Sequence, residues 1–195
     1  MDFENPDRMY LIFDSILNTS LGSMILPIYR NYIKGLDLAG DEMMLELGSG
    51  SGIATRHLAG VLGKGGGRVL CVDPSRAMTD IARKRLGKRS NVEIKTGDIR
   101  SLEIDDASCD AAFVHFTLHD IDEVIRLDTI KTLFRKLRPG GKLFLREPTE
   151  KFGAMPVDEM RDVLTQGGFT EQSHRMTSAP LFGPMYEAVY VKPAA

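Results

Sequence analysis

The segment that most constrains this chain is a short apolar run that ends in a glycine-rich turn. The run Met43–Leu47 leads into Gly-Ser-Gly-Ser-Gly at positions 48–52, and a segment with helical spacing of apolar residues follows, Ile53–Leu62. A strand that enters a helix through such a turn is typical of parallel α/β sheets that bind a nucleotide-like cofactor. Glycine suits the turn because it adopts positive φ and lets the backbone approach a ligand closely.

The rest of the chain alternates between strand-like and helix-like patterns. We expect strands at 43–47, 68–72, 92–95, 111–116, 141–146, 169–174 and 187–191, and helices at 52–62, 75–86, 122–137 and 156–166. This alternation predicts an α/β, Rossmann-like, doubly wound sheet with helices on both faces. Helical patterns after Pro6 and at 24–33 predict an N-terminal helical cap. A length of 195 residues suits one domain, with the cap at 1–40 and the core at 41–195.

Composition and charge are those of a soluble globular protein, with 43% hydrophobic and 27% charged residues. A formal net charge of -2 argues against a large nucleic-acid interface. Cys71 and Cys109 lie in apolar runs, which indicates buried thiols in a reducing compartment rather than a disulfide framework. No metal site is predicted. No run reaches the ~18 apolar residues of a membrane span, and the start lacks signal-peptide features, so we expect a cytoplasmic location.

The spacing of the glycines narrows the class of cofactor. The dinucleotide fingerprint would place its third glycine at Ile53, whereas here glycines fall at alternate positions and Glu46 lies two residues before the first. This Glu-x-Gly-x-Gly-x-Gly pattern resembles motif I of the class I S-adenosylmethionine (SAM)-dependent methyltransferases. The resemblance implies that Glu46 helps position the methionine amino group and that the loop passes close to the methionine and ribose. The implied cofactor-binding residues of this motif are Glu46, Gly48, Ser49, Gly50 and Gly52.

An acidic residue ends the second expected strand. A carboxylate at Asp73 can accept hydrogen bonds from both ribose hydroxyls, and its distance from the glycine loop is that of nucleotide-binding folds. Pro74 follows it and is assigned to the same cofactor site. The alternative is that Asp73 caps the helix that starts near Ser75.

The third expected strand leads into Gly97-Asp98-Ile99. This segment resembles the one in which the family's aspartate meets the exocyclic amine of adenine. Ile99 is then an apolar wall against the adenine. The alternative is an exposed turn, for which Gly-Asp is common.

The fourth expected strand ends at the sheet edge that faces the ligand crevice in open α/β folds. His115 and Phe116 lie where the family lines the SAM pocket. His119 and Asp120 lie one step further, where substrate is expected, and His119 is the candidate catalytic residue. The alternatives are a loop histidine at 119 and a helix cap at Asp120 or Asp122.

The remaining likeness concerns turns and strand order. Positions 137–143 are very like the Leu-Lys-Pro-Gly-Gly-x-Leu turn of the family, and the last two strands resemble the pair that closes its seven-stranded sheet, mostly parallel with an antiparallel last strand. The resemblance spans about positions 35–192. On positions 116–120 and 156–169 it is closest to small-molecule methyltransferases of the ubiquinone and menaquinone biosynthesis type.

The resemblance implies methyl transfer from SAM to a small-molecule acceptor, with S-adenosylhomocysteine as product. We further expect the cap to close over the site, with Tyr10, Tyr29 and Tyr32 as its polar aromatic contacts. One alternative is a SAM-binding module without its own catalysis that acts through a partner. Another is an NAD-dependent oxidoreductase, which Ile53 and the Gly97-Asp98 segment count against. The sequence does not set the oligomeric state.

Overall fold

The computed structural model describes residue 15 and residues 22–150, 154–179 and 182–194. The first helix expected in the cap, with Tyr10, lies outside these residues. The second is observed as α2 (Gly22–Lys34), which accommodates Pro27 in its interior. Among the helices of the described part of the chain, none combines the length and the apolar character that a membrane span needs.

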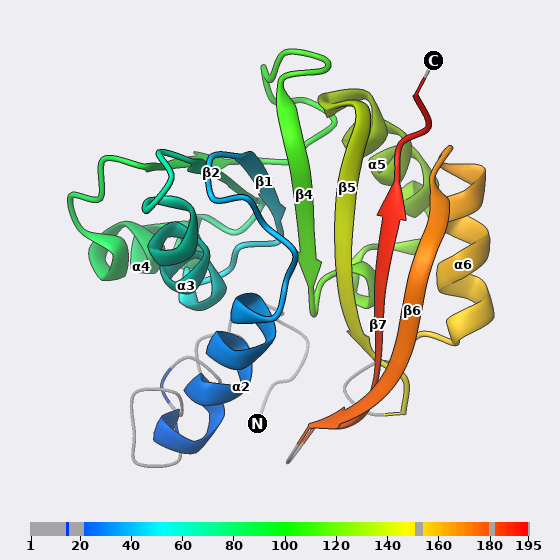
Figure 1. The fold of residues 1–195 in the computed structure, drawn as a ribbon, viewed down its shortest axis with the longest axis horizontal. Coiled ribbons are helices and arrows are strands. Elements are labelled where there is room, and N and C mark those ends of the chain that lie inside the picture. The colour runs from blue at the N-terminus through cyan, green and yellow to red at the C-terminus, as the bar shows by residue number, and fades with distance from the viewer. Residues whose placement is uncertain (1–14, 16–21, 151–153, 180–181, 195) are drawn as a thin grey trace.

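Seven strands form one sheet in the order β3-β2-β1-β4-β5-β7-β6 (Figure 1). Neighbours from β3 to β5 pair in parallel, whereas β7 is antiparallel to both β5 and β6. The doubly wound fold with an antiparallel last strand is therefore confirmed. The strands are β1 (Met43–Leu47), β2 (Arg68–Asp73), β3 (Val92–Thr96), β4 (Cys109–His115), β5 (Leu137–Pro148), β6 (Thr170–Ala179) and β7 (Gly183–Val191).

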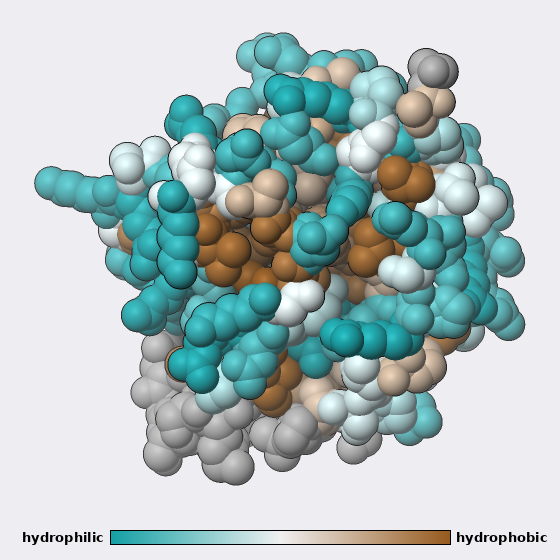
Figure 2. Space-filling view, viewed as in Figure 1, coloured by the Kyte–Doolittle hydropathy of each residue, from teal (hydrophilic) through white to brown (hydrophobic). Residues whose placement is uncertain are grey.

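Helices cover both faces of this sheet. The helices that follow α2 are α3 (Ile53–Leu62), α4 (Arg76–Leu86), the 3-10 helix η1 (Leu118–Asp120), α5 (Glu123–Lys136) and α6 (Val157–Gln166). Figure 1 shows α3 and α4 beside the β1–β2 end of the sheet and α5 and α6 at the β5–β6 end. Figure 2, from the same side, shows apolar side chains in the middle of the face with hydrophilic ones around them.

The central strands contribute alternate side chains to two buried clusters. Phe113 of β4 packs with α2 and α3 residues, and its neighbour Val114 packs with α5 and α6 residues. In β5, Phe144 likewise belongs to the cluster with α2 and α3, and Leu145 belongs to the cluster with α5 and α6. Because both faces are buried, the central strands contain runs of apolar residues, as parallel strands usually do.

Several strands differ from their predicted bounds. β5, β6 and β7 are longer than the apolar runs that predicted them. β6 is an edge strand with mostly exposed, polar side chains, so little of it reads as an apolar run. β4 ends one residue early, since Phe116 has a φ of 55° and leaves the strand. A non-glycine residue in the left-handed region is uncommon, and here it turns the chain at the functional edge of the sheet.

Candidate cofactor and acceptor site

The glycine loop joins β1 to α3, and its three alternate glycines all have positive φ. A Cβ on Gly48 would lie 2.2 Å from Cγ2 of Thr117, and one on Gly52 would lie 3.0 Å from Leu86 of α4. A Cβ on Gly50 would meet nothing within 4 Å. The outer glycines therefore allow close packing of the protein itself, whereas Gly50 faces open space that a ligand can fill.

Asp73, the last residue of β2, holds this loop in place. Its carboxylate accepts the N–H of Gly50 on Oδ2 at 2.7 Å and the N–H of Ser75 on Oδ1 at 2.9 Å. The cap of α4 is Ser75, whose hydroxyl accepts the N–H of Met78 at 3.2 Å. The alternative in which Asp73 caps the helix is therefore wrong. A carboxylate is acceptor-only with about four lone-pair positions, so Asp73 is chemically suited to ribose hydroxyls, which are donors. Pro74 is exposed beside it.

Glu46 lies beneath the loop and is 2% exposed. Its Oε2 accepts the Thr55 hydroxyl at 2.6 Å and lies 3.7 Å from the Cys71 thiol. Burial raises the pKa of Glu46 to about 7. A cationic ligand group nearby would favour the ionised carboxylate. Ser49 has a buried hydroxyl without a hydrogen-bond partner. A buried acid and an unpaired hydroxyl at one loop fit the amino-acid end of SAM.

Asp98 follows β3 at the same sheet edge. Both of its carboxylate oxygens accept from the Arg100 side chain, at 2.6–3.0 Å, and these hydrogen bonds hold the pKa of Asp98 below its ordinary value. An adenine amine at Asp98 would therefore have to share or displace Arg100. The N–H of Gly97 donates to the Asp73 carbonyl at 2.9 Å, which ties the segment to the ribose position. Ile99 is buried in the core. The adenine role of this segment stays a prediction.

His115 ends β4 beneath α2. Its ring stacks on Phe113 and lies 4.8 Å from Tyr29 and 5.6 Å from Tyr32 between ring centres. Burial holds the pKa of His115 well below its ordinary value, so the ring is neutral. Its Nε2 is buried without a hydrogen-bond partner. Phe116 lies beside it, with 4.8 Å between the two ring centres.

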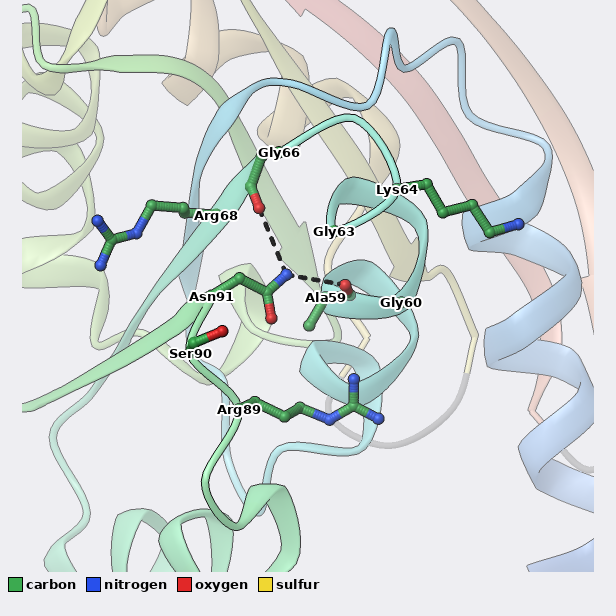
Figure 3. A pocket seen from close by; sticks show the side chains of 10 residues that line it. Ala59, Gly60, Gly63, Lys64, Gly66, Arg68, Arg89, Ser90 and Asn91 are labelled. Carbon is green, nitrogen blue, oxygen red and sulfur yellow. Dashed lines mark hydrogen bonds between the residues drawn. The ribbon is translucent and has the colours of Figure 1, made fainter.

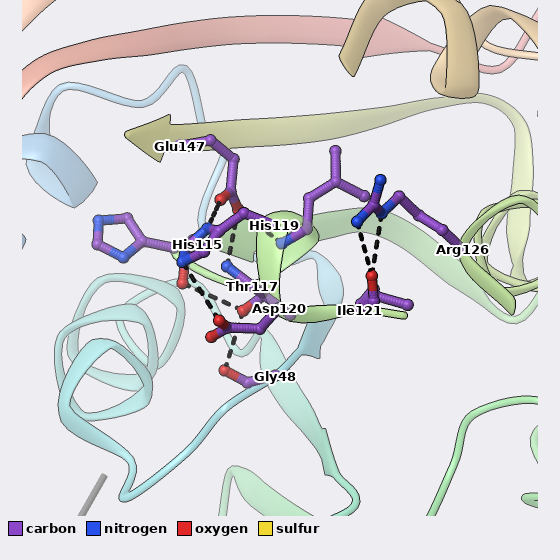
Figure 4. A network of polar contacts seen from close by, with 9 residues as sticks. Gly48, His115, Thr117, His119, Asp120, Ile121, Arg126 and Glu147 are labelled. Atoms are coloured by element: carbon purple, nitrogen blue, oxygen red, sulfur yellow. Dashed lines mark hydrogen bonds and ion pairs between the residues drawn. The ribbon is translucent and has the colours of Figure 1, made fainter. Parts of the chain in front are cut away.

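His119 lies in η1 and contacts Glu147 at the end of β5 (Figure 4). Oε2 of Glu147 pairs with Nδ1 of His119, while Oε1 accepts the N–H groups of Thr117 at 2.7 Å and Leu118 at 2.9 Å. The His119 side chain is only 4% exposed, so an open loop histidine is excluded. Burial lowers its pKa, but the hydrogen bond and charge of Glu147 and the charge of Asp120 outweigh burial and raise it.

The cap of α5 is Asp122, which accepts the N–H of Val124 at 2.9 Å. Asp120 instead lies 3.5 Å from Nε2 of His119. Sequence reasoning missed Glu147 and Arg146, although Arg146 ends a predicted strand and Glu147 follows it, at the edge that carries the site. Their position at the carboxyl end of that strand was the signal that could have identified them as site residues. Thr117 was missed as well, and its hydroxyl donates to the Gly48 carbonyl at 3.4 Å.

A pocket of about 630 Å³ lies away from these residues, at the opposite end of β2 and β3 (Figure 3). Its lining includes Arg68, Arg89 and Asn91, which lie at or just before the first residues of those strands. None of the predicted site residues lines it. In the described residues, no group of three or more His, Cys, Asp or Glu side chains is arranged to hold a metal ion.

The fold and the carboxyl edge of the sheet define a class of protein that binds a nucleoside-type cofactor at β1, β2 and β3. The family model described as a methyltransferase domain matches residues 45–145. The chain belongs to this family of class I SAM-dependent methyltransferases, whose cofactor is S-adenosylmethionine.

Individual relatives agree with this assignment. A demethylmenaquinone methyltransferase of Clavibacter sepedonicus is 32% identical over 120 residues, which cover 62% of this chain and 45% of that protein. A carboxy-S-adenosyl-L-methionine synthase of Vibrio campbellii is 26% identical over 183 residues, 87% of this chain and 72% of that protein. The chain spans less than half the length of the first curated relatives that it matches.

Among solved structures, the N-methyltransferase NodS of Bradyrhizobium japonicum, in complex with S-adenosylhomocysteine, superposes with a TM-score of 0.75. It is 17% identical, and the match covers 94% of this chain and 98% of that one. At this identity the likeness concerns the fold alone.

Proposed function

We propose that the chain transfers the methyl group of S-adenosylmethionine to a small-molecule acceptor and releases S-adenosylhomocysteine. The observation that carries the proposal is the meeting of two sets of side chains at one sheet edge. Glu46 and Asp73 flank the glycine loop, and the buried His119–Glu147 pair lies at the ends of the adjacent strands. Thr117 links the two sets through its contact with Gly48.

Four side chains are assigned to the cofactor. Glu46 would face the methionine amino group, Ser49 would supply its unpaired hydroxyl, Asp73 would accept the ribose hydroxyls, and Asp98 would receive the adenine amine. Bound SAM supplies an electrophilic methyl group whose leaving group it already carries. The protein therefore has to align the acceptor with that methyl and exclude water, and such orientation can contribute roughly 7–11 kcal/mol.

His119 is the proposed general base for an acceptor that must lose a proton. Glu147 holds Nδ1, which favours the tautomer in which Nδ1 carries the proton and Nε2, 3.5 Å from an Asp120 oxygen, carries the lone pair. Nε2 accepts the acceptor proton, and the buried Glu147 carboxylate then stabilises the charged ring. The raised pKa of His119 agrees with this role.

The cap is proposed to cover the acceptor, as a part of the single domain. Tyr29 and Tyr32 of α2 are buried against the sheet, and the Tyr32 hydroxyl donates to the Leu145 carbonyl at 3.1 Å. These contacts place aromatic side chains over the ends of β4 and β5. They supply the water exclusion that methyl transfer needs.

The test is transfer of a deuterated methyl group from labelled SAM to a panel of phenols, amines and carboxylic acids, read by mass spectrometry. Labelled product with matching S-adenosylhomocysteine is the expected result, reduced in His119→Gln. His174→Gln is the matched control, because His174 also pairs with a glutamate, Glu171, at 2.6 Å, but on β6. SAM binding without transfer to any compound would favour a non-catalytic module that acts through a partner.

A further inference from the structure

Four polar side chains form a row across the sheet on the α2 face. His115 of β4 is directly opposite Arg146 of β5, Arg146 is opposite Glu187 of β7, and Glu187 is opposite Arg175 of β6. Residues opposite each other in a sheet project to the same face. Tyr32 of α2 covers this row, with the Arg146 guanidinium carbon 4.7 Å from its ring centre.

Arg146 has a charge partner but too few hydrogen-bond acceptors. It is 5% exposed, and its Nε and Nη1 are buried without a hydrogen-bond partner, which leaves three of its five N–H groups unpaired. Oε1 of Glu187 lies 2.9 Å from Nε, outside hydrogen-bond alignment. The Glu187 oxygens accept instead from Arg175 at 2.7 Å and Thr177 at 2.9 Å. Buried polar groups are normally paired, so these donors indicate a missing acceptor.

The neighbouring His115 adds another buried polar atom that lacks a hydrogen-bond partner. Its Nε2 is buried without a partner, and the ring is neutral because burial and the Arg146 charge both lower its pKa. Aromatic rings surround it, those of Tyr29 and Phe116 each at 4.8 Å between centres. Unpaired polar atoms of His115 and Arg146 therefore lie among aromatic rings, a surrounding that suits a flat, largely apolar molecule with a polar end.

The row lies beside the glycine loop. The N–H of Phe116 donates to the Arg146 carbonyl at 3.0 Å, and Thr117, the next residue, contacts Gly48. An acceptor bound at Arg146 would lie at the sheet edge where its nucleophile can meet the methyl group.

We infer that Arg146 and His115 form a subsite for a carboxylate of the methyl acceptor, and that the acceptor is an organic acid with a flat apolar body. This inference rests on the proposed function. The acceptor carboxylate takes the unpaired N–H groups of Arg146, and the body lies against Tyr29, Tyr32 and Phe116. Since the tyrosines cover the subsite, they shift to admit the acceptor and then pack against its body.

Charge and shape both favour a carboxylate. The two arginines and one glutamate of the row leave a single net positive charge, because His115 is neutral. A monoanion balances that charge, whereas a phosphate dianion would exceed it. A guanidinium also matches the two oxygens of a carboxylate in one plane.

The test uses benzoate as probe and benzamide as its neutral counterpart, titrated into the full chain with and without S-adenosylhomocysteine. Wild type should bind benzoate about tenfold more tightly than benzamide, and Arg146→Met should lose about tenfold in benzoate affinity. Arg146→Met keeps a long side chain, and Glu187 retains Arg175 and Thr177 as partners. The matched control is Arg138→Met, which removes an exposed arginine at the other end of β5, outside the row, and should leave benzoate affinity unchanged. Thermal unfolding checks that each variant is folded.

The outcomes separate this inference from the proposed function. Equal benzoate affinity of wild type and Arg146→Met, or no benzoate binding by wild type, overturns the subsite. A loss of S-adenosylhomocysteine affinity in Arg146→Met assigns the arginine to the cofactor and also overturns it. Benzoate binding that depends on Arg146 in a chain that does not bind S-adenosylhomocysteine supports the subsite and refutes the proposed methyl transfer.

Discussion

Glu147 at the end of β5 holds the ring of His119 in η1 through its Oε2, and both side chains are buried. Its other oxygen accepts the N–H groups of Thr117 and Leu118. One carboxylate therefore fixes both the backbone of the loop after β4 and the orientation of the histidine in it. A positioned histidine with one nitrogen held by a carboxylate is the arrangement that general-base catalysis uses.

The rate of methyl transfer should depend on the protonation of His119. Glu147 and Asp120 raise the pKa of the ring above its ordinary value, and only the neutral ring can accept a proton. The rate should therefore rise with pH through that raised pKa. Glu147→Gln should lower the apparent pKa, and His119→Gln should reduce kcat roughly 10²- to 10⁴-fold. Steady-state rates from about pH 6 to about pH 8 measure both effects, with His174→Gln as control. A pH-independent wild-type rate would exclude His119 as the base.

Glu46 should make the folded protein less stable as pH rises. Burial raises its pKa in the folded state from 4.5 to about 7, so the folded state favours the protonated form. The stabilisation is complete below the unfolded-state pKa and is lost as pH rises through about 7. The loss in the free energy of unfolding amounts to about 3 kcal/mol, at about 1.36 kcal/mol per pKa unit.

Glu46→Gln keeps an acceptor for Thr55 but cannot ionise, so it should gain stability relative to wild type between about pH 5 and about pH 8. Urea unfolding across this range measures the difference. The exposed Glu103→Gln is the control. Parallel stability curves for wild type and Glu46→Gln would contradict the raised pKa.

SAM binding should release a proton from Glu46. The cationic amino group assigned to this carboxylate would favour its ionised form, and a group with a pKa of about 7 is partly protonated at neutral pH. Calorimetric titration near pH 6.5 in two buffers of different ionisation enthalpy counts the released proton. The release should disappear in Glu46→Gln. Release that persists in that variant would place the amino group elsewhere.

Two glycines of the cofactor loop should respond differently to alanine. Gly48→Ala should be the more destabilising change, because its Cβ would overlap Thr117 at 2.2 Å and φ is 71°. Gly50→Ala has φ 51° but no atom within 4 Å of the new Cβ, so it should cost about 1 kcal/mol in stability. Its main effect should be weaker SAM binding. Thermal unfolding and SAM titration of both variants measure the two effects. Unchanged SAM affinity in Gly50→Ala would show that Gly50 is not part of the cofactor site.

The order of elements could be predicted because local patterns determine it. The central strands are buried on both faces, so each reads as an apolar run followed by a polar turn. Glu46, Asp73 and Asp98 could be placed at one edge because the carboxyl ends of parallel strands meet there. The strand β6 was predicted too short because its exposed, polar side chains give little hydrophobic signal.

The partners of His119 and Arg146 could not be predicted in the same way. Glu147 lies 28 residues from His119 in sequence, and their contact depends on the register of β4 against β5. The pairing of Arg146 with Glu187 depends likewise on the antiparallel insertion of β7. The role of Asp73 in holding Gly50 was missed because it depends on how the loop folds back over β2.

The most direct test of the account is calorimetric titration of the chain with SAM, S-adenosylhomocysteine and NADH, repeated on Asp73→Asn and on the exposed control Asp105→Asn. We expect micromolar binding of SAM and S-adenosylhomocysteine, weakened in Asp73→Asn and unchanged in Asp105→Asn. Preferential binding of NADH, or no binding of SAM, would contradict the assignment of the glycine loop and of every cofactor contact built on it.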